Sequence, residues 1–113
     1  MIEQTPAVED TPIACNLTGD EHVKRGEEVR ALFHEVEQVR ELDDGYAFRF
    51  PGGDTWASRL LEFTLTERRC CPFFTFELVF EPNEGPIWVH LRGSAAIKES
   101  LVGGFVAAAT ARA

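Results

Sequence analysis

The chain has 113 residues, a formal net charge of −8 and 44% hydrophobic residues, which is ordinary for one globular domain. Its acidity argues against direct binding to nucleic acid, and no apolar run approaches the ~20 residues that a membrane-spanning helix needs. The start of the sequence has neither the basic nor the apolar region of a secretory signal. We therefore expect a cytoplasmic protein that contacts neither nucleic acid nor a membrane directly.

The beginning of the chain combines a tail with the start of a helix. Residues 1–12 hold two prolines and an acidic, weakly apolar stretch, which predicts a disordered tail before a single domain at 13–113. Thr18 and Glu21 have the spacing of a capping box, so a helix is expected to follow them and to end near His34. Five charged residues are expected mostly on the solvated side of this helix: Lys24, Arg25, Glu27, Glu28 and Arg30.

A hairpin is predicted next. The dipeptide Asp44-Gly45 is typical of a tight turn, because it tolerates the positive φ angles that such a turn needs. Polar residues precede it and alternating apolar residues follow it. We expect an edge strand at 36–42 that pairs with a strand at 46–50.

A second helix is predicted between the two hairpins of the chain. Asp54 is the expected cap, and apolar side chains recur at helical spacing from there to Cys70. Pro72 cannot continue a helix and disfavours helical geometry at Cys71. The helix is therefore expected to end at the cysteine pair.

The rest of the chain predicts two strands and a last helix. Apolar and polar residues alternate at 74–81 and again at 87–92. Ser94 is a suitable cap for a helix that would bury Ile97 and Leu101.

The separated hairpins predict an α+β fold, with an antiparallel sheet of about four strands and helices on one face. The expected order is helix, strand, strand, helix, strand, strand, helix, while the order of strands within the sheet is left open. Five phenylalanines at alternating positions are expected to fill a single sheet face: Phe48, Phe50, Phe74, Phe76 and Phe80.

The three cysteines, Cys15, Cys70 and Cys71, are the candidate functional residues. An odd, sparse set is not a disulfide framework, and adjacent cysteines are poorly placed to bond to each other. Cys70 and Cys71 are instead suited to act as two ligands of one soft ion. Cys15 would be a third ligand if the start of the first helix packs beside the end of the second. Glu67 precedes Cys70 by one helical turn, so its carboxylate either pairs with an arginine or belongs to a polar site with the thiols.

Thiolate ligands select soft or borderline ions such as Hg(II), Cu(I) or Zn(II). Zinc would need a fourth ligand, for which His22, Glu67 and water are candidates, whereas three sulfurs suffice for mercury or a trivalent metalloid. Arg68 and Arg69 favour the thiolate form at a helix end whose dipole opposes it. The alternative is that the cysteines are packed as small apolar side chains with no ligand.

Four segments carry a resemblance to a known group of proteins: 14–18, 42–50, 67–76 and 87–93. The pattern Cys…Glu-x-x-Cys-Cys-Pro-Phe in them resembles that of small, uncharacterised bacterial proteins. It is also similar to the C-terminal thiol domain of some mercury-resistance (MerR-type) regulators. The resemblance implies that Cys15, Glu67, Cys70 and Cys71 occupy the marked positions of the family. No helix-turn-helix region precedes the domain in this sequence, so we expect a free-standing sensor, carrier or scavenger.

The leading hypothesis is therefore a protein that binds a soft metal or metalloid ion, such as mercury or zinc, through three thiolates. A first alternative is a thiol-based redox or catalytic protein that uses Cys70 or Cys71. A second is a non-catalytic interaction module that meets a protein partner or a second copy of itself. We expect binding rather than catalysis, because no histidine stands in an obvious pairing position beside the thiols.

Overall fold

The structure is a computed structural model that describes residues 19–111. Its helices are α1 (Gly19–Phe33), α2 (Asp54–Cys70), α3 (Ala95–Leu101), the π-helical segment η2 (Val102–Val106) and α4 (Ala107–Thr110). Its strands are β1 (Gln38–Leu42), β2 (Gly45–Phe50), β3 (Thr75–Phe80) and β4 (Ile87–Arg92). The predicted α+β class and the predicted order of elements are confirmed. The predictions for residues 1–12, Cys15 and Thr18 fall outside the described residues.

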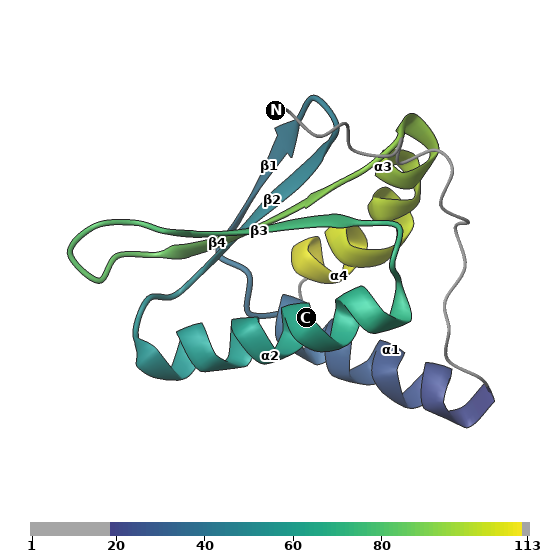
Figure 1. Cartoon of the computed structure of the whole chain (residues 1–113), viewed down its shortest axis with the longest axis horizontal. Helices are drawn as coiled ribbons and strands as arrows, with labels where there is room; N and C mark the ends of the chain where they lie inside the picture. Colours follow the sequence, from purple (N-terminus) through teal and green to yellow (C-terminus); the bar gives the residue numbers. More distant parts are fainter. Residues whose placement is uncertain (1–18, 112–113) are drawn as a thin grey trace, which may run out of the picture.

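The four strands form one antiparallel sheet in the order β1-β2-β4-β3. Each hairpin pairs its own strands, and β4 lies beside β2 in the centre, so that β1 and β3 are the two edges. Figure 1 shows the helices gathered on one side of this sheet, with α2 running beneath β3. The strand order is the part of the fold that the sequence pattern left open.

The turn between β1 and β2 depends on its glycine. The hairpin forms where it is predicted, but Leu42 pairs with Gly45, so the two turn residues are Asp43 and Asp44 and Gly45 is already the first residue of β2. The expected positive φ angles are not used, because Asp43, Asp44 and Gly45 all have negative φ. Gly45 also pairs with Arg92 of β4, and a Cβ atom at Gly45 would overlap the carbonyl oxygen of Leu91. A glycine is therefore required here by the close approach of the central strand.

Phe33, at the end of α1, is the centre of the hydrophobic core. Its side chain is fully buried, and its ring centroid lies 4.9 Å from that of Phe48 and 5.3 Å from that of Phe63. The ring of Phe105 in η2 lies at 4.9 Å as well. One aromatic side chain thus joins the sheet, α2 and the C-terminal helices, and this contact fixes α1 against the rest of the molecule.

Two local predictions are wrong. Asp54 is the first residue of α2 and not its cap; Gly53 holds the cap position with a φ of 109° and makes no side-chain capping bond. This left-handed conformation suits glycine, and Asp54 instead places its carboxylate in the first turn, where the helix dipole favours it. Phe80 is 57% exposed, whereas Phe48 and Phe50 are buried as expected.

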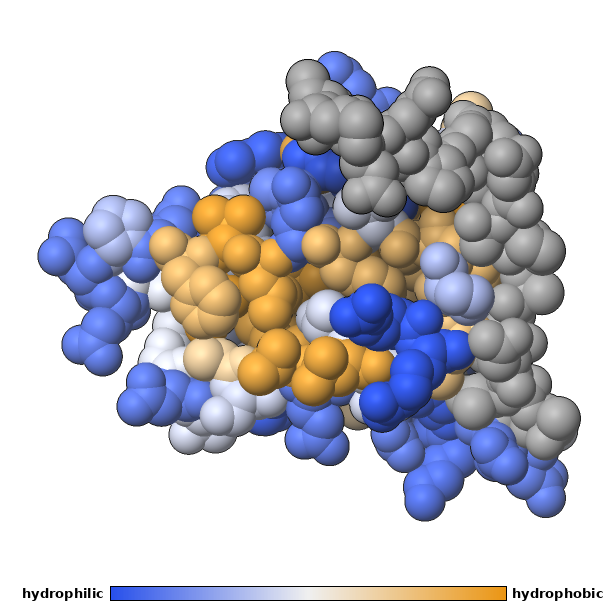
Figure 2. All heavy atoms as spheres, viewed as in Figure 1, coloured by the Kyte–Doolittle hydropathy of each residue, from blue (hydrophilic) through white to orange (hydrophobic). Residues whose placement is uncertain are grey.

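Two apolar side chains of α2, Leu61 and Leu65, are exposed together with Phe80 of β3, and we name these three residues the β3–α2 patch. The exposed fractions of these side chains are 51%, 44% and 57%. Figure 2 shows apolar side chains gathered where β3 passes over α2. The patch lies beside a sheet edge, so both apolar side chains and strand backbone are exposed there.

The sheet face away from the helices carries an ion-pair network. The guanidinium of Arg92 donates to Glu77 at 2.6 Å and to Asp44 at 2.6 Å, and the ring of His90 lies 3.1 Å from the Glu77 carboxylate. The guanidinium of Arg40 covers the ring of Trp88 at 4.4 Å. These contacts explain how a face without helices tolerates a large aromatic side chain.

This network predicts a weak loss of stability in acid. Hydrogen bonds from Arg92, and then from His90, hold the pKa of Glu77 below its ordinary value. A lowered folded-state pKa stabilises the fold above the unfolded pKa of about 4.3, and this contribution disappears as the pH falls through the folded value. Because the Glu77 side chain is 47% exposed, we expect less than about 1 kcal/mol.

The measurement is urea unfolding of the wild type and Glu77→Gln between pH 7 and pH 3. Glu77→Gln should be slightly less stable at neutral pH and should lose less stability on acidification. Equal stability of the two proteins at every pH would show that the network contributes nothing.

Among residues 19–111, no helix is long and apolar enough to cross a membrane.

Candidate functional site

The cysteine pair stands at the end of α2, as the sequence predicts. Cys70 is the last residue of the helix and is 5% exposed, and Cys71 is half-buried. The backbone N–H of Cys71 donates to the carbonyl oxygen of Glu67 at 2.7 Å, while its φ of −129° and ψ of 76° leave helical geometry. Pro72 accounts for this exit. Cys70 and Cys71 are not joined to each other by a disulfide.

Glu67 is the buried acid of the site. Its residue is 4% exposed, and one carboxylate oxygen, Oε2, accepts hydrogen bonds from Nη2 and Nε of Arg25 at 3.0 and 3.2 Å. The sequence predicts either an arginine partner or a place beside the thiols, and the structure gives Glu67 both. The partner comes from α1, which precedes α2 by a whole hairpin, and is not one of the neighbouring Arg68 and Arg69.

Arg25 ties α1 to the end of α2. Besides Glu67, its guanidinium reaches the carbonyl oxygen of Phe63 at 3.5 Å and lies 5.6 Å from the Phe63 ring centroid. Its side chain is 17% exposed, so the prediction that it belongs to the solvated side of the helix is wrong. The carboxylate of Glu67 explains the burial, because an acid at that depth requires a charged partner.

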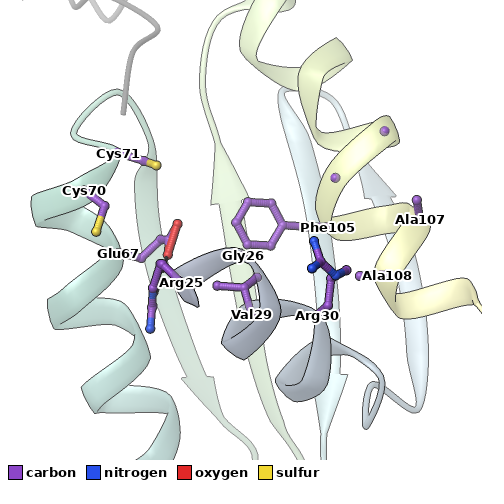
Figure 3. Close-up of a pocket in the computed structure, with 12 residues that line it drawn as sticks. Arg25, Gly26, Val29, Arg30, Glu67, Cys70, Cys71, Phe105, Ala107 and Ala108 are labelled. Carbon is purple, nitrogen blue, oxygen red and sulfur yellow. Dashed lines mark hydrogen bonds and ion pairs between the residues drawn. The ribbon is translucent and has the colours of Figure 1, made fainter. Parts of the chain in front are cut away.

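A cavity of about 450 Å³ opens beside this ion pair. Its polar lining comes from Glu67, Cys70 and Cys71 of the α2 end and from Arg25 and Arg30 of α1. The remaining lining residues are apolar or lack a side chain: Gly26, Val29, Gly103, Gly104, Phe105, Ala107 and Ala108. Figure 3 shows the thiols and Glu67 at one side of the cavity and Phe105 with the alanines at the other.

The C-terminal helices supply the far wall, which no pattern in the sequence predicted. Gly103 and Gly104 fall within η2, where the helix widens by one residue per turn, and the site of Cβ at either glycine is open space. Phe105 of the same segment reaches both the cavity and the core. Two adjacent glycines weaken a helix, and this was the only sign in the sequence that the last helix would be irregular here.

The structure therefore brings together three of the four predicted site residues: Glu67, Cys70 and Cys71 line one cavity. Cys15 and the side chain of His22 lie outside the described part of the chain. Within residues 19–111, no group of three His, Cys, Asp or Glu side chains is arranged to hold a metal ion. The described donors fit a soft ion by their chemistry, since two thiols and a carboxylate share one wall, but they do not complete a ligand set alone.

No protein-family model, curated protein or solved structure matches the chain. The resemblance to thiol domains of mercury-resistance regulators therefore stays a prediction from the sequence.

Proposed function

We propose that this protein binds a soft metal or metalloid ion, such as Hg(II) or Zn(II), at the end of α2. Cys70 and Cys71 are the thiolate ligands from the described residues, and Cys15 is the third. The observation that carries the proposal is that both thiols and the Glu67 carboxylate line the same cavity. Adjacent thiols with no bond between them are well suited to one thiophilic ion.

The role of Glu67 in this proposal is defined by Arg25. Because Oε2 accepts two hydrogen bonds from the guanidinium, Glu67 is held in one orientation beside the thiols. It acts as a neighbour that orients the site, and it supplies an additional ligand only for ions that take oxygen as well as sulfur. Arg25 and Arg30 also line the cavity, and the charge of Arg25 is paired there with that of Glu67.

We also propose a location for the protein in the cell. Thiols that must stay reduced to bind an ion require a reducing compartment, and we therefore propose the cytoplasm. A sensor, a carrier and a scavenger all use the same site, and they differ in what receives the ion.

A titration of the reduced protein with Hg(II) or Zn(II) tests the proposal. We expect binding of one ion per chain, with an ultraviolet thiolate-to-metal absorption for Hg(II). A reduced, folded protein that binds neither ion above the level of a cysteine-free variant would contradict it.

A separate observation favours a protein partner, and we propose that this partner is a second copy of the chain. The edge strand β3 lies beside the β3–α2 patch and carries a single charged residue, Glu77, whereas the opposite edge strand β1 carries Arg40 and Glu41 within five residues. Native edges are normally protected by charge, as β1 is. Two β3 strands can pair antiparallel around a two-fold axis.

Charge decides the register of that pairing. An axis at Leu78 places Phe76 opposite Phe80 of the partner subunit and extends the apolar patch across the interface. An axis at Glu77 would place the two Glu77 carboxylates opposite each other, which is unfavourable. The Leu78 register is therefore the one that β3 supports.

Sedimentation analysis with one pair of variants tests the dimer. We expect the wild type to be a dimer at micromolar concentration and Phe80→Lys to be a monomer, because a charge would be buried in the interface. Val23→Lys is the matched control, since Val23 is 60% exposed on α1 and away from β3. A monomeric wild type, or equal dissociation of both variants, would contradict the dimer.

A further inference from the structure

The size of the cavity exceeds the needs of a bare ion. A single ion fills a small part of about 450 Å³, whereas cavities of this size bind organic molecules. Apart from the end of α2 and the two arginines, the described lining is apolar or lacks a side chain, so an organic group bound there would make apolar contacts. The volume therefore calls for a ligand with an apolar part of its own.

The lining of the cavity is divided in a way that matches such a ligand. The thiols and the Arg25–Glu67 ion pair stand at the end of α2, and Val29, Phe105 and Ala108 give apolar surface away from them (Figure 3). Gly26 and Gly104 also line the cavity and bring no side chain into it. A ligand that fits has a thiol-reactive centre at one end and an apolar group at the other.

Resting on the proposed function, we infer that the ligand is an organic derivative of a trivalent metalloid, of the class of a monoaryl or monoalkyl arsenic(III) compound. Such a centre keeps one carbon substituent and exchanges its other bonds for sulfur, so it needs two thiolates. Cys70 and Cys71 provide two, and the organic substituent occupies the apolar end of the cavity.

The exchange is balanced without any oxidant or reductant. An aryl arsenic(III) oxide reacts with the two thiols to form two As–S bonds, and the oxygen leaves as water with both thiol protons. Arsenic stays trivalent and both sulfurs stay reduced. The bridge spans Cys70 and Cys71 through the arsenic atom, so the strain of a direct disulfide between neighbouring residues does not arise.

The test compares three probes on the reduced full chain: phenylarsine oxide, arsenite and Hg(II). We expect a one-to-one phenylarsine adduct in intact mass spectrometry, formed with loss of water. We also expect phenylarsine oxide to bind at least about tenfold more tightly than arsenite in calorimetry, because burial of the phenyl ring adds affinity.

Two variants fill the cavity without removing any sulfur. Because Gly26 and Gly104 both line the cavity, we expect a leucine at either position to occupy part of it. Among the described residues, a Cβ at Gly26 would meet Nη1 of Arg30 at an ordinary 3.5 Å. Both positions are helical, so leucine is compatible with the fold. Glu27→Leu is the matched control, because Glu27 is exposed on α1 and does not line the cavity.

The filled variants should lose the preference for phenylarsine oxide over arsenite and keep Hg(II) binding, and the control should keep both. If the wild type binds Hg(II) but shows no preference for the aryl compound, the inference is wrong and the proposed function stands. The inference is equally wrong if Gly26→Leu and Gly104→Leu leave the preference unchanged. Loss of Hg(II) binding in the wild type itself would overturn the proposed function and the inference together.

Discussion

Replacement of both Cys70 and Cys71 by serine should abolish tight binding of Hg(II), with an affinity loss of more than about 100-fold. Mutation of a residue that is hydrogen-bonded to a metal ligand typically lowers metal affinity by about 10- to 100-fold. The loss is expected to be larger here because the ligands themselves are removed. A hydroxyl oxygen is a poor ligand for a soft ion and remains protonated at neutral pH. The measurement is a competition titration that follows the thiolate-to-metal absorption.

The single variants separate the contributions of the sulfurs. Cys70→Ser and Cys71→Ser should each lose tight binding, whereas Cys15→Ser should leave a weaker two-sulfur site for Hg(II) and lose Zn(II). Because Cys70 is buried and Cys71 is half-buried, the serine at position 70 should also cost more folding stability. Binding by the double variant equal to that of the wild type would place the ion elsewhere.

The second large effect concerns the ion pair that joins α1 to α2. Arg25→Met leaves the Glu67 carboxylate, 5% exposed, without its cation, and we expect the free energy of unfolding to fall by about 3 kcal/mol. Arg25→Met combined with Glu67→Leu should recover most of this loss, because an apolar pair carries no desolvation penalty for a buried charge. Urea unfolding of the reduced, metal-free protein measures both changes.

Arg30→Met is the matched control for this experiment. Arg30 lies on the same helix and lines the same cavity but is exposed, so its replacement should change stability by less than about 0.5 kcal/mol. If Arg25→Met unfolds at the same urea concentration as Arg30→Met, the ion pair does not stabilise the joint between α1 and α2. A stable Arg25→Met protein with unchanged Hg(II) affinity would also remove the orienting role of Glu67.

Elements with local signals were predictable from the sequence. Asp44-Gly45 located the first hairpin, although the glycine is required by the close approach of β4 and not by a positive φ angle. Pro72 located the end of α2 because it cannot donate a helical hydrogen bond. Ser94 caps α3 as predicted, accepting a hydrogen bond from the backbone N–H of Ile97 at 3.3 Å. These features depend on a few neighbouring residues and not on the rest of the fold.

Features that depend on distant contacts were not predictable. The burial of Arg25 follows from a carboxylate 42 residues further along the chain, and nothing in the charge pattern of α1 distinguishes this arginine from its exposed neighbours. Phe80 has the alternation of a buried strand residue, but it lies on the outer strand of the sheet and is left exposed. The far wall of the cavity likewise required knowledge of where η2 packs.

The most direct test of the central claim is X-ray absorption at the mercury edge, on reduced protein loaded with one equivalent of Hg(II). We expect sulfur as the nearest neighbour of mercury and a lower sulfur coordination number in Cys70→Ser and in Cys71→Ser. A nearest shell of nitrogen or oxygen alone, or a sulfur shell that neither substitution changes, would contradict it.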